Sequence, residues 1–284
     1  MEVAVSKGFI VLAQNTDEVD YVKQAYVLAL SIHATQTETA ISLMTNDTVP
    51  AEYIDVFDQI IPIPWVDETQ TRFRSENRWK IYHVTPYDET IVLDSDMLML
   101  DDINDWWWFC QEHDLLFCSK ALNYKNEIIS NSLYRKTFTE NNLPNPYFAL
   151  HYFKKSETAE YFYKTLEFVV NNWEWCYGKL ASEHYQNWLS MDLSAAIALE
   201  LSGLNHIANE CSPLQFVHMK PGVQGWRPIP EQWTKTIPYM YTKSGELIVG
   251  NIKQHYLFHY VEKDFADDDM IEKLKKLKHG RISN

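Results

Sequence analysis

The sequence predicts an α/β fold, in which helices flank a mostly parallel central sheet and the C-terminal portion is irregular. Short apolar runs of strand length alternate with stretches of helical periodicity over the first 118 residues. Strands that alternate with helices at this spacing indicate βαβ units and a parallel sheet. Five prolines between residues 213 and 238 then divide the last third into short pieces.

The first half begins with an apolar run at residues 8–13, which is typical of a buried strand and ends in polar loop residues. From Asp20 the apolar residues follow helical spacing as far as Ile32, so a helix comes next. Apolar runs and their flanking turn residues predict the other elements of this half: strands at 41–44, 59–63, 91–100 and 114–118, and helices at 50–57, 77–84 and around 106–108.

The second half is harder to read, because residues 120–145 have weak periodicity and many asparagines, which indicates loops and short helices. Beyond them the patterns predict strands at 147–153, 214–218 and 254–260, and helices at 157–170 and 191–201. The tail from residue 266 carries acidic residues before lysines, an order that suits a helix dipole. No repeat or low-complexity linker is found, so we expect a single domain.

Composition excludes several classes of protein. A net charge of −14 argues against non-specific nucleic-acid binding, which needs a basic surface. Four scattered cysteines without metal-ligand spacing, and no signal peptide, indicate reduced thiols in a cytoplasmic protein. No apolar run is long enough to span a bilayer. The lysine-rich tail leaves peripheral contact with an anionic membrane open, although a solvated helix end is the simpler expectation.

The strand at 91–100 carries the clearest chemical signal, since Asp94 and Asp96 interrupt two apolar runs. Side chains two residues apart on a strand point the same way, so both carboxylates are expected at the strand end, with Ser95 turned away. Two carboxylates this close repel each other unless a cation lies between them. Mg²⁺ and Mn²⁺ prefer such oxygen ligands and often bind substrate phosphates as well. We therefore expect a metal and nucleotide-diphosphate site.

These residues resemble the GT-A fold glycosyltransferases, and within them family 8 with its glycogenin- and galactosyltransferase-like members. The strand with Asp94 and Asp96, followed by Leu100-Asp101-Asp102-Ile103, resembles the DxD strand of that family. The segment from Asp20 to Gln24 is similar to its Asn-Tyr-Val-x-Gln motif. The order of later elements also agrees: an extended segment, a helix opened by an Asp and a late His. The resemblance covers roughly residues 8 to 263.

The resemblance implies a division of the domain and a set of donor-binding residues. Residues 1–118 would form the nucleotide-binding half and 119–265 the acceptor-side half, with a C-terminal helix at 266–284. The family stacks a tyrosine on the uracil base, which here is Tyr21. The other residues expected to contact the nucleotide are Ala13, Gln14, Asn15, Thr16, Arg78, Asp94, Ser95, Lys220 and Lys263.

The resemblance also implies catalytic residues. A basic residue near the donor sugar and diphosphate corresponds to Arg78 or Lys80, and we assign the catalytic role to Lys80 together with Asp192. Either basic residue could instead form a salt-bridged helix face, and Asp192 could simply cap its helix. The family outcome is retention of the anomeric configuration.

The third metal ligand is expected to be a late histidine, for which the sequence offers two partial motifs. His259 lies at the more suitable distance from Asp192 and is followed by Lys263. His218 is the alternative, because Lys220-Pro221 and the pair at 225–226 (Gly-Trp) follow it. With the two aspartates, either imidazole suits Mn²⁺ better than Mg²⁺.

The predicted function is metal-dependent transfer of a sugar from a nucleotide-diphosphate donor, a UDP-sugar, to a hydroxyl of a glycan, lipid or protein acceptor, as in hexosyltransferases. Three alternatives share some features. A haloacid-dehalogenase-type phosphatase has its Asp-x-Asp near the N-terminus, with Thr or Val where Leu98 stands. A sugar nucleotidylyltransferase needs a Gly-rich loop after the first strand, unlike residues 13–16. A non-catalytic sugar-binding module would not need paired aspartates.

Overall fold

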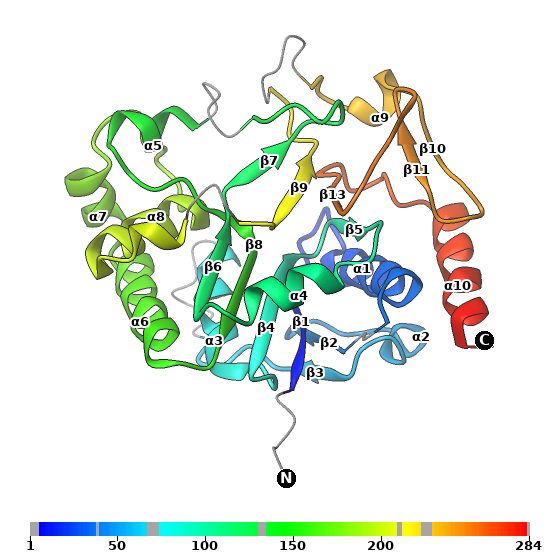
Figure 1. Ribbon diagram of the computed structural model, residues 1–284, viewed down its shortest axis with the longest axis horizontal. Coiled ribbons are helices and arrows are strands. Elements are labelled where there is room, and N and C mark those ends of the chain that lie inside the picture. Colours follow the sequence, from blue (N-terminus) through cyan, green and yellow to red (C-terminus); the bar gives the residue numbers. More distant parts are fainter. Residues whose placement is uncertain are drawn as a thin grey trace.

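A computed structural model describes residues 6–37, 40–66, 74–129, 135–208, 212–222 and 229–282, and its centre is a six-stranded sheet (Figure 1). The strand order is β3-β2-β1-β4-β8-β6. Only β8 runs antiparallel to its neighbours, so the predicted mostly parallel sheet is confirmed. The bounds are β1 Lys7–Leu12, β2 Ile41–Met44, β3 Gln59–Ile61, β4 Glu89–Asp94, β6 Leu115–Cys118 and β8 Tyr147–Lys154.

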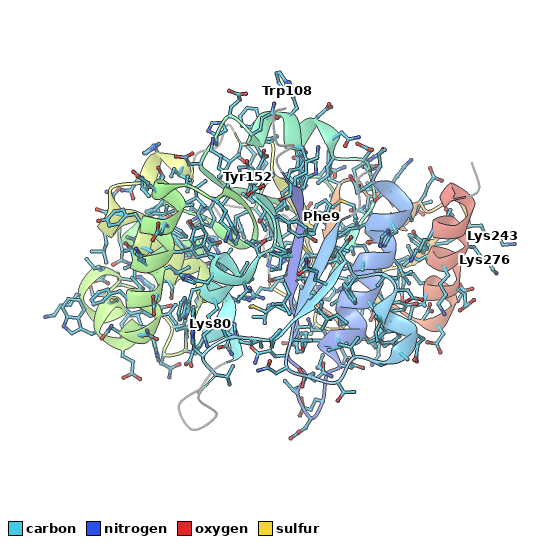
Figure 2. The ribbon with its side chains drawn as sticks, turned by 90° about the horizontal axis from the view of Figure 1, so that it is seen from below. Phe9, Lys80, Trp108, Tyr152, Lys243 and Lys276 are labelled. Carbon is cyan, nitrogen blue, oxygen red and sulfur yellow. The ribbon has the colours of Figure 1, made fainter. Side chains whose placement is uncertain are left out.

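Helices bury both faces of this sheet, as the continuous apolar strands require. In β1, Phe9 packs into a core with helices α1 (Tyr21–Thr35) and α4 (Asn104–Cys110). The next residue, Ile10, faces a second core with α6 (Glu157–Asn171) and α8 (Met191–Ser202). Figure 2 shows Phe9 within the sheet layer, whereas Trp108 of α4 points away from the molecule and is 73% exposed.

A second sheet lies beside the carboxyl ends of the central strands and has the order β5-β13-β9-β7. Its strands are β5 Met97–Met99, β13 Leu257–His259, β9 Gln215–His218 and β7 Lys120–Leu122. Strand β5 is antiparallel to β13, and the other two pairs are parallel. A small antiparallel sheet follows, built from β10 Tyr239–Tyr241, β11 Leu247–Val249 and β12 Ile252–Lys253.

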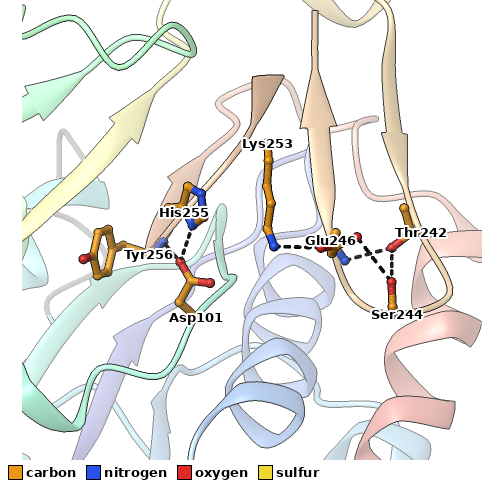
Figure 3. A network of polar contacts seen from close by, with 7 residues as sticks. All are labelled: Asp101, Thr242, Ser244, Glu246, Lys253, His255 and Tyr256. Carbon is orange, nitrogen blue, oxygen red and sulfur yellow. Dashed lines mark hydrogen bonds and ion pairs between the residues drawn. The ribbon is translucent and has the colours of Figure 1, made fainter. Parts of the chain in front are cut away.

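The Asp101 carboxylate fixes the start of β13 against the end of β5 (Figure 3). It accepts a hydrogen bond from the backbone N–H of Tyr256 at 2.8 Å and lies 3.0 Å from Nδ1 of His255. The register that follows pairs Leu257 with Met99. In the adjoining small sheet, Lys253 of β12 forms an ion pair with Glu246 at 2.7 Å.

Local sequence signals place several helix ends. Asp20 caps α1 by accepting from the N–H of Lys23, and Ser156 and Ser190 cap α6 and α8 in the same way. The remaining elements are α2 Ala51–Ile54, the 3₁₀ helix Arg74–Lys80, α3 Ile81–Val84, α5 Lys136–Glu140, α7 Trp173–Leu180, the 3₁₀ turn Asn205–Ile207, α9 Trp233–Thr236 and α10 Asp268–Ile282.

The expectations fail in several places. The single strand predicted at 91–100 is two strands in different sheets, because β4 ends at Asp94 and β5 begins at Met97. The helix at 77–84 is a 3₁₀ helix followed by one α-helical turn. Residues 120–145 contain a strand, β7, whose partner β9 is distant in sequence. Helix α7 was not predicted, since residues 173–180 lack a clear apolar stripe.

The C-terminal helix α10 packs against α1, and Met270, Ile271 and Leu274 are buried there. Lys273 and Lys275 form ion pairs with acidic residues of the same helix, and Figure 2 shows Lys276 pointing outward. Membrane contact by α10 stays a prediction. The division of the domain near residue 118, into a nucleotide-binding half and an acceptor-side half, also stays a prediction. In the part of the chain described, no helix combines the length and apolarity needed to cross a bilayer.

Candidate functional site

Asp94, Asp96 and His259 converge at the edge where the two larger sheets meet. One ligand atom from each lies within 4.8 Å of the others. The Nε2 atom of His259 is 3.1 Å from Oδ2 of Asp96. The side chains of Asp96 and His259 are almost fully buried, whereas Asp94 is partly exposed. Ligands of α/β sheets bind at this carboxyl edge of the parallel strands.

The two aspartates converge for a different reason from the one that the sequence suggested. They do not share a face of one strand, because Ser95 and Asp96 form a turn between β4 and β5. The N–H of Tyr260 donates to the carbonyl oxygen of Asp96 at 3.2 Å, which fastens this turn to the end of β13. Strand β13 pairs with β5 so that His259 lies opposite Met97. The imidazole of His259 therefore reaches the turn formed by Ser95 and Asp96.

Of the two candidate histidines, the structure brings His259 into the acidic cluster. His218 lies beside it on β9, and the two rings stack with centroids 4.8 Å apart. Burial lowers the pKa of His218 well below its ordinary value, so its ring is neutral at neutral pH. The Gly-Trp pair at 225–226, which favoured His218 in the sequence, lies outside the described residues.

Two cations already compensate the carboxylates. Arg78 forms an ion pair with Asp94, and Lys263 forms one with Asp96. Burial opposes ionisation of Asp96, but the charges and hydrogen bonds of His259 and Lys263 outweigh it. The pKa of Asp96 therefore stays well below its ordinary value.

A tight turn at Val261 places His259 and Lys263 on the same carboxylate. The N–H of Glu262 donates to the carbonyl of Tyr260 at 2.7 Å, and Val261 between them has φ 64°. This is the pattern of a γ-turn, and a β-branched residue is rare at positive φ because its side chain clashes with the backbone. Such strain is found mainly where the surrounding structure holds it in place for function.

The side chain of Gln24 in α1 holds the turn at Val261 through two hydrogen bonds. Its side-chain Nε2 donates to the carbonyl oxygen of Lys263 at 3.1 Å, and its Oε1 accepts a hydrogen bond from the Tyr260 hydroxyl. Trp233 donates from Nε1 to the carbonyl of Tyr260 at 2.9 Å. The backbone of the turn is thus fixed on two sides. Gln24 belongs to the motif that the sequence singled out, but this role was not predicted.

Two pockets open on either side of the cluster and share Ser75, Arg78, Asp94 and His259 as their common wall. The first, which we call the Tyr21 pocket, has a volume of about 330 Å³ and is further lined by Leu12, Gln14, Thr16, Tyr21, Ser95, Asp96 and Lys263. The second, the Asp192 pocket, has a volume of about 480 Å³, and its lining includes Arg135, Phe138, Tyr147, Trp188, Asp192, His218 and Lys220.

The loop after β1 contributes only some of the residues expected there. Gln14, Thr16 and Tyr21 line the Tyr21 pocket. Ala13 is buried in the core, with its N–H bonded to the carbonyl of Met44. Asn15 shapes the loop, because its side-chain oxygen accepts from the N–H of Val22 at 3.0 Å. Ala13 and Asn15 therefore do not line either pocket.

Asp192 lines its pocket but is held by a residue that the sequence did not indicate. Nη1 of Arg135 donates to Oδ2 of Asp192 at 2.5 Å, and the N–H of Phe148 donates to Oδ1 at 2.7 Å. The Arg135 guanidinium lies over the rings of Phe138 and Tyr147. Arg135 falls in the weakly periodic segment, and nothing in its sequence context marks it as functional.

Lys80 does not reach the cluster. Its ammonium donates to the carbonyl of Trp65 at 3.0 Å, and the residue lines neither pocket. Lys80 is buried where the 3₁₀ helix passes into α3 (Figure 2). Burial lowers the pKa of Lys80. Arg78, two residues earlier in the 3₁₀ helix, is the basic residue that lies beside the end of β4.

The donor set fits a divalent cation. Two carboxylates and an imidazole nitrogen are ligands that Mn²⁺ accepts, and Mg²⁺ suits the oxygens alone better. The other ring nitrogen of His259, Nδ1, is buried and has no hydrogen-bond partner among the described residues. The polar contact of the ring is therefore made through Nε2, which points to the aspartates. Asp94, Asp96 and His259 would hold such an ion between the two pockets.

Comparison with solved structures identifies the fold. The galactosyltransferase LgtC, solved in complex with donor and acceptor sugar analogues, matches with a TM-score of 0.50 at 12% sequence identity. The match covers 96% of this chain and 95% of that of LgtC. The chain has the GT-A fold. The predicted fold class is therefore confirmed.

Two further structures are similar to this GT-A chain at lower scores. The glycosyltransferase GlyE of Streptococcus pneumoniae TIGR4 matches at 14% identity and a TM-score of 0.46, over 98% of this chain but 63% of that of GlyE. Mouse xyloside xylosyltransferase 1 matches at 10% identity and a TM-score of 0.43, over 70% and 83% of the two chains. No protein-family model and no curated protein sequence matches this chain.

Proposed function

We propose that this chain is a metal-dependent glycosyltransferase that moves a sugar from a nucleoside-diphosphate donor, a UDP-sugar, to an acceptor hydroxyl. The observation that carries the proposal is the convergence of Asp94, Asp96 and His259 between two pockets at the sheet edge. One pocket would take the nucleoside and the other the sugar, with the diphosphate between them. LgtC, which shares the fold, was solved with donor and acceptor sugar analogues, and this supports a site with two substrates.

Charge supports a diphosphate at the wall between the pockets. When bound, Mn²⁺ or Mg²⁺ supplies positive charge to the leaving diphosphate. Arg78 and Lys263 lie on the two metal-binding carboxylates, and Lys220 lines the Asp192 pocket. Side chains of this kind can form charge-assisted hydrogen bonds to phosphate oxygens. They would hold the diphosphate and stabilise it as it leaves.

The Tyr21 pocket suits the nucleoside, because the Tyr21 ring offers a flat face to a base and Gln14 and Thr16 offer polar atoms beside it. The Asp192 pocket suits the sugar. Its carboxylate is fixed by Arg135 and the N–H of Phe148, so it can accept hydrogen bonds from sugar hydroxyls without reorganising. Trp188, which is 47% exposed at this pocket, gives an aromatic surface for the acceptor side.

The test is incubation with Mn²⁺ and a panel of nucleotide sugars, with donor hydrolysis as the readout when no acceptor is known. We expect one or more UDP-sugars to be hydrolysed, and Asp96→Asn to abolish hydrolysis. Asp105→Asn, which removes the same charge from an exposed position, is the matched control. A chain that hydrolyses no nucleotide sugar, and is not stabilised by any nucleotide with Mn²⁺, would contradict the proposal.

A further inference from the structure

The Lys263 ammonium lies between two groups that the proposed function assigns to different ligands. It forms the ion pair with Asp96, a proposed metal ligand. The same ammonium lies 5.0 Å from the centroid of the Tyr21 ring, which is the proposed surface for the base. Its side chain is 27% exposed, whereas that of Asp96 is 8% exposed. Lys263 is thus the movable member of this group.

From this arrangement we infer that Lys263 couples metal binding to nucleotide binding, because each ligand has to displace the same ammonium. The inference rests on the proposed function. A cation that binds Asp96 competes with Lys263 for the carboxylate, and a base that stacks on Tyr21 competes with Lys263 for the ring face. The ligand that binds first carries the cost of moving Lys263. The second ligand binds without that cost, which is positive cooperativity.

The formal charges of the cluster also favour cooperative binding of the metal and the nucleotide. Counting His259 as neutral, the form in which an imidazole binds a metal, the formal charges of Asp94 and Asp96 are balanced by those of Arg78 and Lys263. A divalent ion entering alone would leave the cluster with an excess of two positive charges, in a largely buried place. A nucleoside diphosphate brings the negative charge that removes this excess. The free protein should therefore bind Mn²⁺ weakly, and with UDP it should bind Mn²⁺ tightly.

The backbone around Lys263 favours movement of the side chain over movement of the turn. Gln24 and Trp233 hold the carbonyl oxygens of Lys263 and Tyr260, so the main chain stays in place when the ammonium leaves. From this anchored position the flexible lysine stem can swing from Asp96 to a phosphate oxygen. Lys263 would then act as a positioning residue for both ligands.

The experiment measures Mn²⁺ affinity by calorimetry for the wild-type chain and for Lys263→Met, without nucleotide and with UDP. We expect Lys263→Met to bind Mn²⁺ alone roughly five-fold or more tightly than wild type. Lys23→Met, which removes a lysine that forms an ion pair with the exposed Asp268, is the charge control and should leave the affinity unchanged. Uridine is the second probe, because without phosphates it cannot bridge to the metal. Mn²⁺ should tighten uridine binding in wild type but not in Lys263→Met.

The outcomes separate this inference from the proposed function. If the wild-type chain binds UDP with Mn²⁺ but Lys263→Met shows no gain in affinity for Mn²⁺ alone, the coupling is wrong and the enzyme assignment stands. The coupling is also wrong if Mn²⁺ still tightens uridine binding in Lys263→Met. If wild type binds neither Mn²⁺ nor UDP under any condition, the proposed function itself fails.

Discussion

Arg135 donates a hydrogen bond from Nη1 to Oδ2 of Asp192 over 2.5 Å, and the arginine side chain that makes it is only 3% exposed. Further donors on the same guanidinium bond the side chain of Asn145 and the carbonyl of Pro146. The pair joins the segment after β7 to the first turn of α8. It therefore fixes two residues that line the Asp192 pocket relative to each other.

Replacing Arg135 by methionine should destabilise the fold, because it leaves the partly buried Asp192 carboxylate without its cation. Removing one partner of a buried pair typically costs about 3–5 kcal/mol, and the 23% exposure of Asp192 places the expected loss at the lower end. Urea unfolding measures the change. The double variant Arg135→Met, Asp192→Asn should lose less than the sum of the single variants. Additive losses would mean that the two residues act independently.

Replacing Val261 by glycine should raise the free energy of unfolding or leave it unchanged. The positive φ of 64° in this turn costs a non-glycine residue about 1–3 kcal/mol, and glycine adopts positive φ freely. The gain is partly offset by the larger entropy of glycine in the unfolded chain. Val19→Gly, in a loop without positive φ, is the control and should be destabilising. If both variants lose the same stability, Val261 is not strained.

The stability of the chain should fall as pH is lowered below 6.5, in part through His151. This buried ring contacts the carbonyl of Phe148 and the hydroxyl of Tyr163, and burial lowers its pKa from 6.5 to about 3. Between these values the unfolded chain binds a proton that the folded chain does not. Stability from this residue is therefore complete above pH 6.5 and is lost toward pH 3, by at most about 1.4 kcal/mol per pH unit.

His151→Gln should flatten this pH dependence, because glutamine does not titrate and can still bond Tyr163. Urea unfolding at pH 7, 6 and 5 gives the slope for both proteins. Equal slopes would show that His151 does not contribute.

Tyr21→Ala should weaken UDP binding in the presence of Mn²⁺ by about 1–3 kcal/mol, the usual loss when a base loses an aromatic partner. Tyr21→Phe keeps the ring and should bind UDP almost as well as wild type. Calorimetry with Mn²⁺ in excess measures both. Unchanged binding in Tyr21→Ala would place the base elsewhere.

Local patterns were sufficient to predict the parallel strands, α1 and α6. A buried strand and an amphipathic or capped helix leave signals within a few residues, such as the capping Asp20 or the apolar run of β1. The same is true of Asp94 and Asp96, because two acids between apolar runs are unusual. Their predicted arrangement on one strand was nevertheless wrong, since the sequence does not indicate that the chain turns into another sheet at Ser95.

Contacts between distant segments left no such signal. Strand β7 forms only because β9 lies beside it, and Arg135 matters only because Asp192 is 57 residues away in the chain and close in space. Nothing in the sequence distinguishes Arg78 from Lys80, because both are basic residues of the same predicted helix. The path of the 3₁₀ helix directs Arg78 to Asp94 and Lys80 to the carbonyl of Trp65. The choice between His259 and His218 likewise depends on strand register.

The most direct test of the site is a crystal structure with Mn²⁺ and UDP, with anomalous scattering to locate the metal. We expect one anomalous peak about 2.2 Å from a carboxylate oxygen of both Asp94 and Asp96 and from Nε2 of His259, with diphosphate oxygens as further ligands. Arg78 and Lys263 should then contact the phosphates. A peak at another place, or ion pairs of Arg78 and Lys263 that remain intact with nucleotide bound, would contradict the metal site on which the proposed function depends.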